Sequence, residues 1–125
     1  MMCAEEDLRE PVRDWMLERG LDPHDEVQKC GKIPDVLGLR GSEIEVAVEL
    51  KLSNWRRALY QATIYTTFAQ ESYIAMPWNK REVLERNLDE FIRWGVGILI
   101  VHDDSSVCEM HKSISHNQGG KSGSK

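Results

Sequence analysis

Three polar residues on two neighbouring segments have the types and spacing of a divalent-metal site. Asp35 follows Pro34 in a segment that reads as a strand, and Glu49 and Lys51 stand two residues apart in the next one. Residues two apart on a strand share a face, with about 6–7 Å between them along the chain. If the two strands pair, Asp35 approaches Glu49, and two carboxylates converge beside a lysine. Mg²⁺ or Mn²⁺ accepts such oxygen ligands together with waters and a substrate phosphate.

This group of residues is suited to the hydrolysis of a phosphodiester bond. A metal ion held by Asp35 and Glu49 would polarise the phosphate and lower the pKa of a bound water. Lys51 would orient that water or stabilise the charge of the transition state. The backbone carbonyl of Leu50 is a further candidate metal ligand. The alternative for Glu49 and Lys51 is a solvated strand face with a cross-strand ion pair.

The segment that carries Glu49 is the clearest strand of the chain. Over residues 43–52, apolar residues alternate with alanine and charged residues. This pattern predicts a strand with one apolar face and one largely charged face. Residues 33–40 read as the preceding strand, and Gly41-Ser42 makes a tight connection between the two. We therefore expect an antiparallel pair that brings Asp35 next to Glu49.

Helices and further strands are expected around this pair, from apolar periodicity, capping residues and apolar runs. The expected helices cover residues 8–19, 54–69 and 79–94; the further strands lie near 26–28, at 72–76, at 96–101 in the sheet centre and, weakly, at 107–110. Asn79 and Glu82 would form a capping box for the last helix, which carries Phe91 and Ile92 inward. The order α-β-β-β-α-β-α-β predicts an α/β sandwich with helices on both faces of a central mixed sheet.

The residues Ile33-Pro34-Asp35 and Glu49-Leu50-Lys51 resemble the PD-(D/E)xK signature of the restriction-endonuclease-like superfamily. The helix that follows carries Gln61 and Tyr65, which look like the QxxxY element of the RecB-like branch. Their i,i+4 spacing places both side chains on one helix flank. The resemblance covers the element order from the first helix to the strand near Val101. It implies a restriction-endonuclease-like α/β/α fold and a Mg²⁺- or Mn²⁺-dependent nuclease that cuts DNA.

The resemblance also implies roles for individual residues. Gln61 would be catalytic, and Tyr65 would help to hold DNA or the catalytic residues. Small members of the superfamily, such as archaeal Holliday-junction resolvases, often use a glutamate of the first helix as an extra metal ligand. Glu5, Glu6 and Glu10 qualify by position. Glu6 is preferred over Glu10, because Glu10 precedes a proline and that disfavours helical geometry.

Composition bounds the type of protein. The chain has 125 residues, enough for one domain, and its acidic start lacks the basic and apolar stretches of a signal peptide. We expect a cytoplasmic domain over residues 1–112, without a membrane segment, and a disordered Ser/Gly/Lys-rich tail over residues 113–125. The three cysteines match no disulfide framework, which suits a reducing compartment.

Charge leaves two classes of function open. The net charge of −5 argues against a strongly basic nucleic-acid protein, although metal-site carboxylates contribute to it. Arg56 and Arg57 either contact a DNA backbone or form an ordinary solvated face. The first hypothesis is an active nuclease, selective for DNA structure and acting as a homodimer. The second is a protein of the same fold that binds nucleic acid or regulates a larger complex without cutting.

Overall fold

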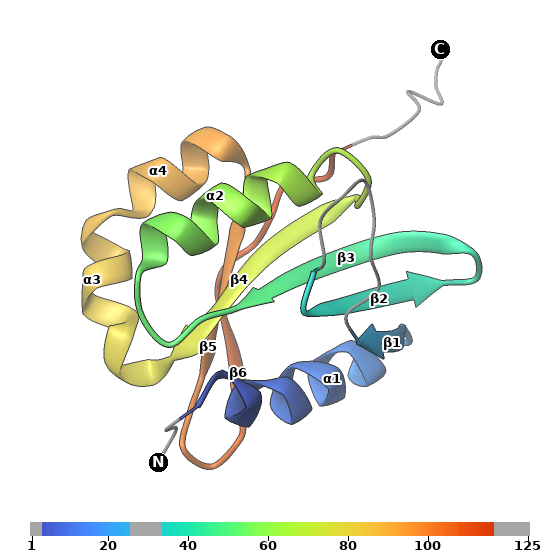
Figure 1. The fold of residues 1–125 in the computed structure, drawn as a ribbon, viewed down its shortest axis with the longest axis horizontal. Coiled ribbons are helices and arrows are strands. Elements are labelled where there is room, and N and C mark those ends of the chain that lie inside the picture. Colours follow the sequence, from blue (N-terminus) through green and yellow to red (C-terminus); the bar gives the residue numbers. More distant parts are fainter. Residues whose placement is uncertain (1–3, 26–33, 117–125) are drawn as a thin grey trace.

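A six-stranded mixed sheet with helices on both faces forms the framework of the protein (Figure 1). The computed structural model describes residues 4–25 and 34–116. Its strands are β1 (Asp22–Asp25), β2 (Val36–Arg40), β3 (Glu43–Leu50), β4 (Glu71–Pro77), β5 (Gly97–Val101) and β6 (Val107–His111). They lie in chain order across the sheet. The pairs β3–β4 and β4–β5 are parallel and the other three are antiparallel, so the expected α/β class with a mixed sheet is confirmed.

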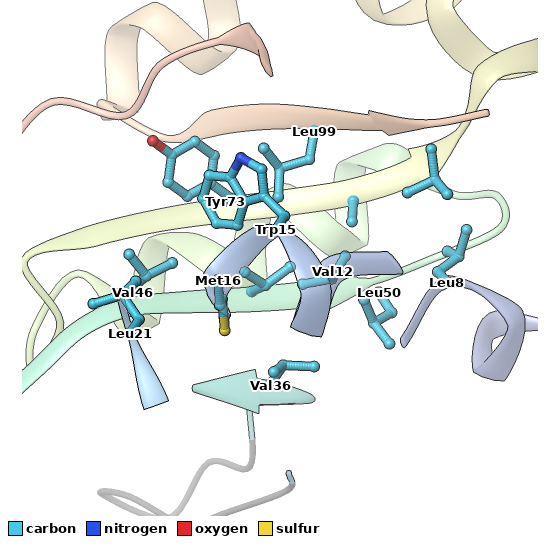
Figure 2. Close-up of a cluster of buried hydrophobic side chains, with 13 residues drawn as sticks. Leu8, Val12, Trp15, Met16, Leu21, Val36, Val46, Leu50, Tyr73 and Leu99 are labelled. Carbon is cyan, nitrogen blue, oxygen red and sulfur yellow. The ribbon is translucent and has the colours of Figure 1, made fainter. Parts of the chain in front are cut away.

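The helix α1 (Arg9–Glu18) covers one face of the sheet, after a 3₁₀ turn, η1 (Glu5–Leu8). The apolar side chains that recur at helical spacing along both elements face the strands (Figure 2). Trp15 packs edge-on against Tyr73 of β4, with ring centroids 5.3 Å apart. The helix ends before Gly20, whose φ of +78° is a left-handed conformation that suits glycine. This packing holds the N-terminal segment beside the end of β3.

Three helices cover the opposite face: α2 (Trp55–Tyr65), α3 (Arg81–Arg86) and α4 (Leu88–Trp94). Their buried side chains pack against residues of β4 and β5 that alternate with those facing α1. Trp55 of α2 and Phe91 of α4 bring the two helices together, with ring centroids 5.7 Å apart. Among the helices of the described ranges, none has both the length and the apolar character needed to cross a membrane.

The predicted hairpin between β2 and β3 is confirmed. The two strands pair antiparallel from Arg40 opposite Glu43 to Val36 opposite Val48. Gly41 in the connecting turn has φ of +65°, as tight turns require. Since Asp35 directly precedes β2, the hairpin brings it to the end of β3.

The two faces of β3 differ from the simple alternation that was expected. Val46, Val48 and Leu50 belong to the cluster under α1, as the pattern predicted. The register between β2 and β3 shifts between Gly38 and Leu39, so Ile44, expected on that same face, packs on the opposite one with Ala47. Ala47 and Glu49, further along, are buried because α2 covers them. A carboxyl group is thus held inside the fold at the end of this strand.

The expected helix from Asn79 to residue 94 is divided in two. Asn79 lies inside a short 3₁₀ turn, η2 (Trp78–Lys80), and makes no cap, so the predicted capping box with Glu82 is wrong. The helix is interrupted at Asn87, between α3 and α4, and the side-chain amide of this residue donates a hydrogen bond to the carbonyl of Val83. The break changes the phase of the second half, and Ile92, expected inside, is 55% exposed.

Three further expectations concern the remaining strands and the tail. The strand expected near residues 26–28 lies outside the described residues, and β1 comes just before that segment. The segment expected in the sheet centre, β5, lies next to the edge strand β6. Ser113, where the disordered tail was expected to begin, is buried, and its hydroxyl contacts the carbonyl of Gly95 and the backbone N–H of Ser72. Residues 117–125 lie outside the described part.

Candidate active site

Asp35 is anchored at the end of β3, one residue before β2 begins. Its Oδ2 accepts a hydrogen bond of 2.8 Å from the backbone N–H of Leu50. Its own backbone carbonyl accepts one of 2.7 Å from the guanidinium of Arg9, on α1. These two bonds hold the carboxyl group against the neighbouring strand, where the sequence placed it.

Glu49 lies beside Asp35, on the face of β3 that α2 covers. Its side chain is buried, and Oε1 accepts a hydrogen bond of 2.6 Å from the hydroxyl of Tyr65. Burial, opposed by the Tyr65 hydroxyl and assisted by the charge of Asp35, raises the pKa of Glu49 to about 7. Burial also raises the pKa of Asp35, against the Leu50 N–H and the charge of Arg9. Two neighbouring carboxyls that resist ionisation are typical of a site that receives a cation.

Lys51 and Leu50 complete the group. The backbone N–H of Lys51 donates to the carbonyl of Ala75 on β4, so the residue continues the alternation of β3 and its side chain shares the face of Glu49. The charge of Lys51 lowers the pKa of both Asp35 and Glu49. Because the N–H and C=O of a strand residue point to the same edge, the Leu50 carbonyl faces the edge where Asp35 accepts its N–H.

Among the N-terminal acids, Glu5 acts on the carboxyl pair, and not Glu6, which the sequence favoured as the extra metal ligand. The charge of Glu5 raises the pKa of both Asp35 and Glu49. The carboxylate of Glu6 instead accepts a hydrogen bond of 2.9 Å from Arg9, and its side chain is 71% exposed. The sequence could not separate the two, because adjacent residues in a 3₁₀ turn point in directions that depend on how the turn docks.

Gln61 and Tyr65 lie on one flank of α2, one turn apart. Tyr65 is 2% exposed, so its ring is inaccessible to a DNA strand, and its hydroxyl serves Glu49. Of the two implied roles for Tyr65, holding a candidate catalytic residue therefore fits the geometry and direct DNA contact does not. The side-chain oxygen of Gln61 is buried and has no hydrogen-bond partner within the described residues. An unpaired buried oxygen destabilises the folded protein, and a bound water or ligand that donates a hydrogen bond would remove this cost.

Arg56 and Arg57 point to different sides of α2, because successive helical residues are about 100° apart. The guanidinium of Arg56 lies 4.5 Å from the ring centroid of Trp55, beside a groove between α2 and α4. Arg57 is exposed and stands one turn before Gln61, on the flank of the candidate site. Only Arg57 is therefore placed to meet a phosphate at Lys51 and Glu49.

The donor set suits a hard divalent cation that keeps several waters. Within residues 4–25 and 34–116, no group of three or more His, Cys, Asp or Glu side chains is arranged to hold a metal ion. Two carboxyls, the Leu50 carbonyl and the orphaned oxygen of Gln61 nevertheless supply only oxygen atoms, as Mg²⁺ and Mn²⁺ prefer. A substrate phosphate and waters would complete such a shell. The residues present therefore fit the ion.

Comparison with known proteins adds no relative from which a role could be transferred. No protein-family model matches the chain, and a search of curated proteins finds no match. The function of the site must be inferred from its own geometry and chemistry.

Replacing Tyr65 with Phe is expected to raise the pKa of Glu49 further. The hydroxyl favours the ionised carboxylate, and losing a hydrogen bond to a charged group corresponds to about one to two pH units. Calorimetric titration with Mn²⁺ should show weaker binding than in the wild type at pH 7 and recovery at pH 9. Tyr60→Phe, on the exposed face of the same helix, is the matched control. Identical pH profiles for Tyr65→Phe and wild type would contradict this role.

Proposed function

We propose that the protein is a metal-dependent nuclease of the PD-(D/E)xK type that hydrolyses phosphodiester bonds in DNA. The observation that carries the proposal is the meeting of Asp35 and Glu49 at the end of β3, with Lys51 directly after that strand. The fold supports it, since the hairpin, α1 and α2 surround this point. The buried hydrogen bond from Tyr65 to Glu49 gives the helix motif a physical role.

Each residue has a task in the proposed hydrolysis. Asp35, Glu49 and the Leu50 carbonyl would hold Mg²⁺ or Mn²⁺, with Glu5 nearby as a further negative charge. The ion, when bound, would neutralise the phosphate and lower the pKa of a water. Lys51 would stabilise the charge on the phosphate as the water oxygen bonds to phosphorus and the bond to one bridging oxygen breaks. The side-chain oxygen of Gln61 would accept a hydrogen bond from the attacking water, whose proton would leave to solvent while the departing bridging oxygen takes up another.

The substrate is expected to be chosen by its structure and not by a base sequence. Residues 4–25 and 34–116 form one sheet with its covering helices, and no separate recognition domain lies among them. Arg57 contributes a phosphate contact beside the site, whereas specific base contacts need side chains that reach into a groove of the duplex. A flap, a strand end or a branched junction is therefore the proposed class of substrate, and a homodimer would present two sites to two strands.

A second candidate function is binding of nucleic acid without cleavage. The observation in its favour is that the described residues contain no cluster of three acidic or imidazole metal ligands. The net charge of −5 also fits a regulatory subunit better than an independent DNA enzyme. On this alternative Glu49 would stay protonated below about pH 7, and no metal would bind there.

A cleavage assay with calorimetry separates the two functions. Purified protein is incubated with labelled linear, flapped, single-stranded and four-way-junction DNA, each with Mg²⁺, Mn²⁺ or EDTA. We expect cutting that requires metal and is absent from Asp35→Asn prepared in the same way, which excludes a contaminating nuclease. If the wild type cuts none of these substrates and calorimetry detects no Mn²⁺ binding at pH 8, the catalytic proposal fails and the binding scaffold remains.

A further inference from the structure

An open groove with aromatic residues among its lining lies between α2 and α4. It has a volume of about 550 Å³ and includes Trp55, Tyr60 and Trp94 among its lining residues. Tyr60 is 62% exposed and Trp94 49% exposed, although large aromatic rings are usually buried. The groove lies on the flank of α2 opposite to Gln61, so it is separate from the candidate active site.

The groove also lies against a basic stretch of an acidic chain. Residues 51–70, which include all of α2, contain Lys51, Arg56 and Arg57 and no aspartate or glutamate. Arg56 lines the groove beside the rings, where its guanidinium lies over Trp55. One carboxylate, Glu90 of α4, stands on the far wall. Basic side chains are therefore concentrated on and just before α2, the helix that also borders the carboxyl pair.

We propose that this groove binds a single-stranded segment of the nucleic-acid substrate, an inference that rests on the proposed nuclease function. Unpaired bases would stack on Tyr60 and Trp94, and Arg56 would contact the phosphate between them. Exposed aromatic rings interleaved with cations are the features that recognise single strands without sequence preference. A strand that leaves the active site has to cross only the width of α2, about 10 Å, to reach the groove.

Charge favours this occupant over a second copy of the chain. A two-fold contact centred on α2 would bring Arg56 and Arg57 towards their own equivalents, with no acidic residue on that helix to offset the repulsion. A phosphate backbone complements the same cations. The groove would thereby select DNA that offers an unpaired arm next to the bond to be cut.

The test measures binding without cleavage. Fluorescence anisotropy with a labelled oligothymidylate in EDTA keeps the result independent of catalysis. We expect Tyr60→Ala and Trp94→Ala each to weaken binding roughly 5- to 150-fold, the range for loss of one base–aromatic stack. Ile92→Ala, at an exposed apolar residue of α4 outside the groove, is the matched control and should bind as the wild type does. Tyr60→Phe keeps the ring and should restore most of the affinity that Tyr60→Ala loses. Arg56→Ala should reduce the salt dependence of log K by about 0.7.

Three results would overturn the inference. The first is no binding of the oligonucleotide by the wild type at low salt, and the second is wild-type affinity in both alanine variants. The third is light scattering that shows a dimeric wild type and monomeric variants without a change in affinity, which would make the groove a contact between copies. Failure of the nuclease proposal is a different outcome: binding in EDTA that depends on Tyr60 and Trp94, with no cleavage in Mg²⁺ or Mn²⁺.

Discussion

Glu49→Gln is expected to lower the rate of Mg²⁺-dependent DNA cleavage by on the order of 10³-fold and to leave the fold intact. The amide matches the carboxyl in shape and can still accept the hydrogen bond from Tyr65. It cannot supply the negative charge that a divalent cation requires from this position. The loss should appear in kcat under saturating DNA, together with weaker Mn²⁺ binding in calorimetry.

A matched control lies on the same strand. Glu45 lies four positions before Glu49 on β3, and it pairs with Arg40 near the surface, with 2.7 Å between Oε1 and Nε. Arg40 also donates to the backbone carbonyl of Arg19 at the end of α1, away from the carboxyl pair. Its replacement by Gln removes one surface ion pair, which is worth little. Glu45→Gln should therefore cleave as the wild type does. Cleavage by Glu49→Gln at a rate near that of the control would contradict the assignment of Glu49 as a metal ligand.

The second large effect is on stability. The free energy of unfolding of the wild type should contain a contribution from Glu49 that falls as the pH rises from about 4.5 to about 7. Over this range the unfolded chain releases its proton at the ordinary pKa of 4.5, whereas the folded protein keeps it until about pH 7. The native state thus binds more protons, and stability decreases with pH. Above pH 7 the folded carboxylate is charged and buried, at a cost on the order of 3 kcal/mol.

Denaturant unfolding of wild type and Glu49→Gln at pH 4 and pH 8, without metal, measures this contribution. The variant cannot ionise at this position. Its free energy of unfolding relative to that of the wild type should therefore increase by on the order of 3 kcal/mol from pH 4 to pH 8. Mn²⁺ at pH 8 should restore stability to the wild type and not to the variant, because a ligand that binds only the folded state stabilises it. Stability curves that run parallel with pH would show that Glu49 has an ordinary pKa.

The two predictions describe one compromise. A carboxyl kept at 6% exposure beside a second carboxyl destabilises the folded chain at neutral pH. Such groups are found at functional sites, where a ligand supplies the missing charge. If Glu49→Gln is more stable than the wild type and inactive, Glu49 serves a binding site at the expense of stability. If Glu49 were instead part of a purely structural ion pair, its replacement would reduce stability.

The local part of the site follows from the sequence alone. The alternation in residues 43–52 determines a strand, because a period of two suits only that conformation, and it places Glu49 and Lys51 on one face. Gly41 and Ser42 determine a hairpin, since a turn of two residues leaves little choice of partner. The proximity of Asp35 to Glu49 is a consequence of these short-range features. The i,i+4 spacing of Gln61 and Tyr65 likewise needs only the geometry of a helix.

Docking of elements far apart in the chain decided the rest. The packing of η1 against the sheet determines that Glu5, and not Glu6, acts on the carboxyl pair. The hydroxyl of Tyr65 reaches Glu49 because α2 covers β3. The break at Asn87 turned Ile92 outward, although the apolar spacing through it looked continuous. Burial of Glu49 depends on α2 in the same way. Periodicity describes one element at a time, whereas the burial and pKa of a side chain depend on what packs over it, which only the tertiary structure determines.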